Sequence, residues 1–336
     1  MEPAGLSLTR IFDAFTGYQR TAALKAAIEI DLFTAIGSGV TTLPALAARC
    51  GAAERGVRAL ANRLVVDGFL TKDGEHYGLA PDAAVFLDGS SAACVASMVH
   101  FLTAPRIRAA FDSLTEAVRR GGTALDQEGT LEPDHPVWVE FARSMAPAAR
   151  MTAEVLAAVL GHQGPLRGSV LDIAAGHGLF GVTLARHNPD LRIVALDWPA
   201  VLEVAAENAR AVGVTERFTR RPGSAFDVDW GTGHALVLLT NFLHHFDPET
   251  CEMLLRRARA ALAPGGRVVV VEFVTDDSRV NPPEAAVFSL TMLASTPAGD
   301  AYTLREYERM FAAAGFAGVE MHQLAPTPQQ VLLGTA

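Results

Sequence analysis

The sequence predicts an α/β chain in which a mainly helical amino-terminal part precedes a doubly wound sheet that ends in an antiparallel hairpin. From residue 169 onward, apolar runs of strand length alternate with helical segments, which is the pattern of a parallel sheet covered by helices on both faces. Before that point the periodicity is mainly helical, and one short hairpin surrounds the Asp-Gly pair at 73–74. We therefore expect three parts, which are residues 1–95, 96–166 and 167–336.

The amino-terminal part begins with a helical pattern over residues 6–36. A short helix follows, with Thr42 as its expected N-cap, and a second helix covers about 54–67. Two short strands then enclose the turn within 68–79. Helices followed by a hairpin in this order predict a winged helix.

The remaining elements alternate in type along the chain. Residues 91–167 predict further helices, broken by the glycine pair at 121–122 and by a loop at 132–136. The Rossmann-like sheet is predicted from strands at 169–173, 192–196, 218–222, 235–240 and 267–272, helices at 178–186, 200–212, 249–263 and 304–315, and a closing hairpin of 319–324 with 330–334.

Composition and charge narrow the class of protein. Hydrophobic residues make up 50% of the 336 residues, so the chain can bury sizeable cores. A formal net charge of −9 argues against nucleic-acid binding, which depends on clustered Lys and Arg. The three cysteines, Cys50, Cys94 and Cys251, fit neither a disulfide framework nor a metal motif. No signal-peptide pattern or membrane-length apolar run is visible, so we expect a cytoplasmic protein that does not bind membranes.

A glycine turn at 171–178 follows the first strand of the predicted sheet. Residues 176–181 fit the dinucleotide pattern GxGxxG, and Asp197 closes the next strand, where a carboxylate can hold ribose hydroxyls. A nicotinamide enzyme is therefore a competing hypothesis. Three features favour S-adenosylmethionine (SAM): Asp172 would repel a pyrophosphate but can serve a cationic methionine end, a Pro-Gly-Gly turn at 264–266 enters a late strand, and one nucleotide half is all that follows.

With these motifs, residues 171–333 resemble the class I SAM-dependent methyltransferases. Together with the winged helix, the chain is similar to the small-molecule O-methyltransferases typified by the caffeic acid and acetylserotonin enzymes. The resemblance implies a homodimer in which the amino-terminal helices interlock and contribute to the partner's substrate pocket. It also implies SAM as cofactor and S-adenosylhomocysteine as product.

The resemblance assigns cofactor contacts to several positions. The glycine loop would contact the methionine portion of SAM, and Asp197, in Asp197-Trp198-Pro199, would hold the ribose. The family's Gly-Asp-x-Phe motif corresponds to residues 223–226 here, where Ser224 replaces the acid, so Asp227 is an alternative near the adenine. The cofactor residues expected on this basis are Asp172, Gly176, Gly178, Asp197, Trp198, Ser224, Ala225, Phe226, Asn241 and Met145.

The same resemblance implies a general base within residues 241–249. His244 occupies the base position, Glu272 matches a carboxylate that orients the base, and Asp300 is nearest to a second such carboxylate. An imidazole near neutral pKa can remove a phenol or enol proton while the methyl group moves from sulfonium to oxygen. Thr240 and His245 depart from the family's Lys and Asp and indicate a divergent branch.

Two other functions remain open from the sequence. His244 and His245 could bind a metal that assists C-methylation of an α-keto acid, although adjacent histidines alone are a weak metal signal and no metal is otherwise expected. A winged helix could also bind DNA in a SAM-domain regulator, but the helix with Arg55, Arg58 and Arg63 is rich in alanine.

An apolar pocket for a small molecule is expected from aromatic and methionine residues. We predict a hydroxylated acceptor, aromatic or polyketide-like. The candidates for contacting it are Phe12, Phe15, Met98, Phe101, Trp138, Phe141, Met145, Phe288 and Met292.

Overall fold

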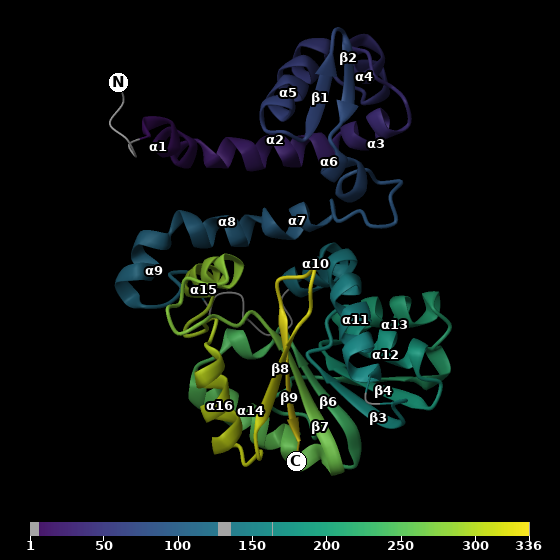
Figure 1. Ribbon diagram of the computed structural model, residues 1–336, viewed down its shortest axis with the longest axis vertical. Coiled ribbons are helices and arrows are strands. Elements are labelled where there is room, and N and C mark those ends of the chain that lie inside the picture. The colour runs from purple at the N-terminus through teal and green to yellow at the C-terminus, as the bar shows by residue number, and fades with distance from the viewer. Residues whose placement is uncertain (1–6, 127–135, 163, 336) are drawn as a thin grey trace. The chain divides into compact units, whose positions relative to one another are not determined.

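The computed structural model describes residues 7–126, 136–162 and 164–335. The described part of the chain divides into two compact units, Met1–His100 and Phe101–Ala336 (Figure 1). Most of the loop predicted at 132–136 lies outside the described residues.

The first unit contains the predicted winged helix. The long helical pattern at its start is divided into α1 (Leu8–Phe15), α2 (Gly17–Glu29) and α3 (Leu32–Gly37), and Asp31 between α2 and α3 has a left-handed φ of 58°. Thr42 occupies the N-cap of the next helix, but its side chain makes no capping hydrogen bond. The unit continues with α4 (Leu43–Arg49), α5 (Glu54–Val66), the antiparallel strands β1 (Leu70–Asp73) and β2 (His76–Leu79), and α6 (Pro81–Phe86).

Helix α1 differs from its neighbours because it buries none of its residues within the chain. The apolar side chains of α3, α4 and α5 form the core of the first unit, with Phe33, Leu46 and Leu64 almost fully buried. In contrast, Phe12 and Phe15 of α1 are 57% and 71% exposed. The amino-terminal helix therefore presents an apolar surface that this core does not use.

Helices of the second unit precede its sheet. Helix α7 (Met98–Leu102) spans the boundary between the units, and α8 (Pro105–Asp112) and α9 (Leu114–Arg120) follow. Gly121 ends α9 in the left-handed conformation (φ 76°), as the predicted break required. Helices α10 (Val137–Ser144) and α11 (Ala146–Gly161) then lead to the first strand.

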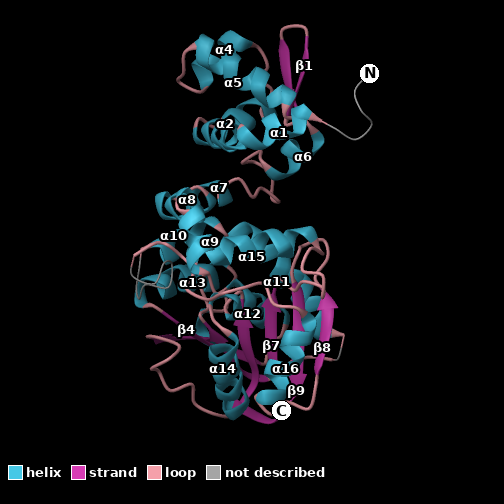
Figure 2. Ribbon diagram, turned by 90° about the vertical axis from the view of Figure 1, so that its left-hand side faces the viewer, coloured by secondary structure: helices cyan, strands magenta, loops and turns pink. Residues whose placement is uncertain are grey.

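In the described residues, the sheet of the second unit has seven strands in the order β5-β4-β3-β6-β7-β9-β8, and β9 is antiparallel to both of its neighbours. Figure 2 draws the strands in magenta and labels β4, β7, β8 and β9 of this sheet. The direction of winding reverses between β3 and β6, which creates a switch point at their carboxyl ends. The strands are β3 (Gly168–Ile173), β4 (Leu191–Asp197), β5 (Phe218–Pro222), β6 (His234–Thr240), β7 (Leu262–Glu272), β8 (Val319–Gln323) and β9 (Gln330–Thr335).

Helices cover both faces of this sheet, and each face has its own apolar core. Helices α11 and α12 contribute to one core and α14 and α16 to the other, which confirms the predicted fold class (Figure 1). The helices that connect the strands are α12 (Leu179–His187), α13 (Pro199–Ala211), α14 (Pro248–Ala261), α15 (Pro283–Ser295) and α16 (Leu304–Ala313), with short 3₁₀ turns η2 (Thr215–Arg217) and η3 (Leu243–His245).

Two elements of the second unit also differ from the sequence-based prediction. Strand β7 begins at Leu262 rather than at 267, so it includes the Pro-Gly-Gly turn. The pairing of β7 with β6 shifts in register there, between His234 and Leu236 of β6. Helix α15 was not predicted, since its apolar residues are spread around the helix rather than along one stripe. None of the described helices is long and apolar enough to cross a membrane.

Candidate active site

The carboxyl ends of four strands bring the predicted site residues to one edge of the sheet. The glycine turn follows β3, Asp197 ends β4, and Glu272 ends β7. The segment that carries His244 follows β6, which pairs with both β3 and β7. Ligands bind at this edge in open α/β sheets, beside the switch point of the strand order.

The glycine turn requires glycine for two different reasons. Gly176 and Gly178 have left-handed φ values of 56° and 68°, which residues with a side chain rarely adopt. A Cβ atom on Gly178 would lie only 2.7 Å from the Cβ atom of Ala205 in α13, whereas one on Gly176 would find its nearest neighbour, in Phe141, at 3.8 Å. Gly178 therefore allows the turn to pack on α13, while Gly176 is favoured by its left-handed φ alone.

Asp197 holds the glycine turn to the end of β4. Its Oδ2 atom accepts a hydrogen bond of 2.7 Å from the backbone N–H of Gly176, and its Oδ1 atom accepts one of 2.7 Å from Trp198. Burial raises the pKa of Asp197 to about 6. The carboxylate thus lies beside the turn, at the position predicted for the ribose.

Asp172 lies beneath the glycine turn rather than beside it. The side chain is fully buried, and Oδ2 accepts a hydrogen bond of 3.2 Å from the backbone N–H of Gly181 in α12. Oδ1 has no partner among the described residues, and burial raises the pKa of Asp172 to about 8. The carboxyl group therefore supports the start of α12, and a contact with the methionine end of SAM stays a prediction.

The predicted adenine-side residues form a compact turn after β5. The hydroxyl of Ser224 accepts a hydrogen bond of 3.1 Å from the backbone N–H of Phe226, so this side chain is engaged by its own turn. Ala225 is buried, whereas Phe226 is 41% exposed and Asp227 is exposed. The backbone N–H of Gly223 donates to the carbonyl of Asp197, which ties the turn to the proposed ribose position.

His244 and Glu272 form a buried pair at the centre of the site. The Nδ1 atom of His244 lies 2.5 Å from Oε2 of Glu272, and the two side chains are 6% and 0% exposed. Oε1 of Glu272 also accepts from the backbone N–H groups of Phe242 (3.0 Å) and His244 (3.3 Å). The carboxylate therefore fixes both the ring and the backbone that carries it, and Nε2 is left without a partner among the described residues.

His245 lies directly against this pair. Its ring centroid is 4.3 Å from that of His244 and 5.6 Å from that of Trp138. Burial and the neighbouring His244 lower the pKa of His245 well below its ordinary value, so this imidazole is neutral at pH 7. Among the described residues, no group of three or more His, Cys, Asp or Glu side chains is arranged to hold a metal ion.

A continuous series of aromatic contacts surrounds the two histidines. Phe101 contacts Phe141, which contacts Trp138, and Trp138 contacts His245. On the other side, Phe288 of α15 lies with its ring centroid 4.7 Å from that of His244. Four of the predicted substrate residues therefore lie in ring contacts around the two histidines, three of them in the series that reaches His245 and Phe288 against His244.

The remaining predicted substrate residues have different surroundings. Met292 is 5% exposed and packs inside its own unit. Phe12 and Phe15 belong to the first unit, where they are exposed. Met145 lies at the junction of α10 and α11, partly buried.

Asp300 accepts hydrogen bonds from residues other than His244. Its Oδ2 atom accepts a hydrogen bond of 2.9 Å from Arg279, and its Oδ1 atom accepts from the hydroxyl of Ser289 and from the backbone N–H of Ala301. No hydrogen bond joins it to His244 in the described part of the chain. The orienting role of Asp300 stays a prediction, and the contacts that it makes hold the loop after α15.

Asn241 lies at the start of the segment that carries the base and has a left-handed φ of 52°. Its Oδ1 atom accepts a hydrogen bond of 3.1 Å from Gln329, whose own Oε1 atom accepts one of 3.0 Å from Thr152 in α11. Neither Gln329 nor Thr152 was predicted from the sequence, because 88 residues separate Gln329 from Asn241 and no local pattern connects them.

His177 was also missed, although it lies inside the glycine motif. It is 4% exposed, and its ring stacks on Phe141 with the planes 20° apart. Burial lowers the pKa of His177 to about 4, and its Nδ1 atom accepts a hydrogen bond from the backbone N–H of Leu179. The signal that could have found it is the aromatic ring between the two glycines of the motif, because a ring in a tight turn must pack against a neighbour, here Phe141.

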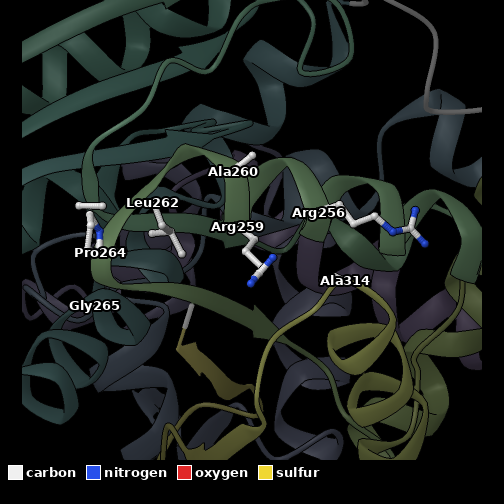
Figure 3. Close-up of a pocket in the computed structure, with 8 residues that line it drawn as sticks. Arg256, Arg259, Ala260, Leu262, Pro264, Gly265 and Ala314 are labelled. Carbon is white, nitrogen blue, oxygen red and sulfur yellow. The ribbon is translucent and has the colours of Figure 1, made fainter.

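A surface hollow of about 560 Å³ lies elsewhere, at the amino-terminal end of β7 (Figure 3). Arg256 and Arg259 of α14 and the turn at Pro264 and Gly265 line it. This end of the strand is opposite to Glu272, so the hollow contains none of the predicted site residues.

Comparison with known proteins finds relatives over almost the whole chain. A family model for the O-methyltransferase domain matches residues 115–317, and one for the O-methyltransferase dimerisation domain matches residues 12–89. The 3-hydroxy-5-methyl-1-naphthoate 3-O-methyltransferase of Streptomyces sahachiroi is 31% identical over 327 residues, which cover 94% of this chain and 92% of the relative.

Solved structures show the same fold over almost the whole chain. A candidate O-methyltransferase of Nostoc punctiforme has a TM-score of 0.95 at 49% identity and covers 98% of this chain and 100% of its own. Human N-acetylserotonin methyltransferase, solved in complex with SAM, has a TM-score of 0.82 at 20% identity and covers 99% of both chains. The enzyme class and the methyl donor expected from the sequence are thereby confirmed. The chain belongs to the SAM-dependent O-methyltransferase family.

Proposed function

We propose that this protein transfers the methyl group of SAM to a hydroxyl of a small aromatic or polyketide-like acceptor, with His244 as general base. The observation that carries the proposal is the buried His244–Glu272 pair: the ring of His244 contacts Phe288, and its Nε2 atom has no partner among the described residues. A base must be within hydrogen-bond reach of the proton that it removes, and an apolar site suits an aromatic acceptor.

Glu272 prepares His244 for proton removal. Because a carboxylate can only accept a hydrogen bond at Nδ1, the proton of the neutral ring resides on Nδ1 and Nε2 carries the lone pair. Nε2 takes the hydroxyl proton while the oxygen attacks the methyl carbon, and the bond from that carbon to the sulfonium breaks to leave S-adenosylhomocysteine. The negative charge of Glu272 then stabilises the imidazolium that forms.

SAM would be held at the same edge of the sheet. The glycine turn lets the backbone approach the methionine end closely, and the Asp197 carboxylate can accept hydrogen bonds from the ribose hydroxyls. Among the described residues the Oδ1 atom of buried Asp172 has no partner, and a water bound to it could connect it to the methionine end. SAM supplies the activated methyl group, so alignment and proton removal are the tasks of the protein.

The acceptor class is proposed from two facts. Phe101, Trp138, Phe141 and Phe288 form the aromatic surface around the histidines. The relative from Streptomyces sahachiroi, by its name, methylates a hydroxynaphthoate. We therefore expect a fused aromatic acceptor with a hydroxyl group.

A panel of hydroxynaphthoates and polyketide-type phenols, incubated with SAM and the protein, tests the proposal. Mass spectrometry and NMR of the product identify the methylated atom. We expect an O-methyl product with the wild-type chain and a rate lower by about 10²- to 10⁴-fold for His244→Ala, whereas His187→Ala, on the exposed face of α12, retains full activity. Full activity of His244→Ala would defeat the general-base role, and activity that is lost on chelation with a product methylated on carbon would favour the metal-assisted alternative.

We also propose a homodimer formed through the amino-terminal domain. Leu8, Ile11, Phe12 and Phe15 of α1 are 48–71% exposed, and exposed apolar surface of this kind marks association sites. Light scattering of the wild-type chain should give the mass of a dimer, and the double variant Ile11→Ser/Phe15→Ser should give the mass of a monomer. A monomeric wild-type chain would contradict the proposal.

A further inference from the structure

Arg257 of α14 forms hydrogen bonds with the backbone of the turn at 223–228, where the adenine of SAM is expected. Its guanidinium donates hydrogen bonds to the carbonyl oxygens of Ala225 (2.7 Å), Phe226 (2.6 Å) and Val228 (2.7 Å). One side chain thereby binds three carbonyls of the turn that follows β5. Neither the family resemblance nor the motif at 223–226 assigns a role to this residue.

Trp230 completes the contact. The Arg257 guanidinium lies over the Trp230 ring, 4.8 Å from its centroid, and the indole N–H of Trp230 donates a hydrogen bond of 3.0 Å to the carbonyl of Ala225. Within the described residues, no carboxylate lies at ion-pair distance from Arg257, so its charge is met by carbonyl dipoles and an aromatic face. The contacts of this guanidinium therefore hold the backbone of the turn in one conformation.

The orientation of the carbonyls determines where the N–H groups point. In a trans peptide the C=O and the following N–H point in opposite directions, so carbonyls drawn towards Arg257 send these N–H groups the other way. Phe226 donates to the hydroxyl of Ser224, and Asp227 and Val228 donate to the Ser224 carbonyl. The N–H groups of the turn are thus bonded within the turn, and its carbonyl groups are bonded to a cation. A cation stabilises the carboxyl end of a helix in the same way.

We infer that Arg257 is a positioning residue for the cofactor, which holds the turn at 223–228 in the shape that receives the adenine of SAM. The turn is tied to Asp197 through the Gly223 N–H, so it lies next to the proposed ribose position. The inference rests on SAM as the cofactor and is independent of His244 as the base.

An arginine is suited to this task for a geometric reason. Nη1 donates to two carbonyls and Nη2 to the third, which uses the planar fork of the guanidinium. A lysine at the same position could place its ammonium near the carbonyls but would lack the fork. Arg257→Lys should therefore behave as an intermediate between the wild-type chain and Arg257→Met.

Binding measurements with the full chain test the inference. Titration calorimetry would give Kd for SAM and for 5′-methylthioadenosine, which keeps the adenine and ribose but lacks the amino-acid end. For Arg257→Met we expect both Kd values to rise by the same factor, about tenfold or more, because charged hydrogen bonds to the turn are lost. The turnover number at saturating SAM, and its pH profile, should stay as in the wild-type chain.

Arg256→Met provides the matched control, since Arg256 is the preceding residue on α14 and bonds Glu252 on the surface. We expect it to bind both ligands as the wild-type chain does, and the melting temperatures of all variants identify any that fail to fold. Unchanged Kd values for folded Arg257→Met, or a rise for SAM alone, would overturn the inference. A wild-type chain that binds neither ligand would overturn the cofactor assignment itself, and the inference with it.

Discussion

The Nδ1 atom of His244 lies 2.5 Å from the Oε2 atom of Glu272, although 28 residues of chain separate the two. Parallel pairing of β6 with β7 causes this proximity, because the carboxyl ends of both strands meet at the same edge. The pair is buried, and its carboxylate also accepts the backbone N–H of His244. A single acidic side chain thus sets the position, the rotation and the proton of the candidate base.

Replacement of Glu272 by Gln tests the control of the proton. The amide oxygen can still accept the backbone N–H of Phe242, which leaves its NH₂ group to face Nδ1. An NH₂ donor forces the ring proton onto Nε2, so the base loses its lone pair. We expect turnover to fall by about 10²- to 10⁴-fold with little change in Kd for SAM. A variant with wild-type turnover would show that the pair is structural, and a circular dichroism melt identifies loss of fold.

Asp172 should make the stability of the chain depend on pH. Its ordinary pKa is 3.8, and burial raises it to about 8 in the folded chain. Between these values the folded chain binds one proton more than the unfolded chain, so the contribution of Asp172 to stability is present at low pH and is lost as the pH rises.

Asp172→Asn removes this titration and keeps an oxygen that can accept the Gly181 N–H. Urea unfolding at several pH values should give a free energy that falls less steeply with pH than in the wild-type chain, by up to about 1.4 kcal/mol per pH unit. Asp190→Asn, at an exposed side chain, is the control and should leave the slope unchanged. Parallel curves for wild-type and Asp172→Asn chains would refute the shifted pKa.

The two glycines of the turn should respond differently to alanine. Gly178→Ala combines a left-handed φ with a Cβ atom 2.7 Å from that of Ala205, whereas Gly176→Ala has the strained φ alone. We expect Gly176→Ala to lower the free energy of unfolding by about 1 kcal/mol and Gly178→Ala by about 2–4 kcal/mol. Adding Ala205→Gly should restore part of the loss for Gly178→Ala only. Equal losses in both single variants would contradict the close packing on α13.

Gln329 should affect turnover although it does not contact the candidate base, because it holds the segment that carries His244. It donates to Asn241, three residues before His244, so Gln329→Ala releases the start of the segment that carries the base. We expect turnover to fall about three- to tenfold, which corresponds to one hydrogen bond of about 1 kcal/mol. Thr152→Val removes only the other hydrogen bond of Gln329 and should have a smaller effect. Equal effects of the two variants would assign the loss to packing.

The sheet could be predicted because its central strands are short apolar runs that alternate with helices, and β5 has the predicted bounds. Helix α15 could not, since it is apolar on several sides and sequence periodicity gives no stripe. In the site, Glu272 and His244 were predicted from a family pattern, and the structure brings them together.

Side-chain direction and long-range contacts were outside the reach of the sequence. The expected contact of Asp172 with the methionine end stays a prediction, and the hydrogen bond that its carboxyl group accepts from Gly181 of α12 was not foreseen. Arg257 contacts a turn about 30 residues earlier, through carbonyl groups that carry no sequence signal. Such contacts depend on how helices and turns pack together, which local patterns do not encode.

Strand β9, the last strand in the sequence, lies between β7 and β8 in the sheet. A nascent chain that has emerged only as far as β8 holds His244 and Glu272 but lacks the strand that joins β7 to β8. Gln329 precedes that strand, so the hydrogen bond that it donates to Asn241 is then also absent. We expect methyl transfer to begin only after these late residues have left the ribosome, so that a truncated translation product would not consume SAM.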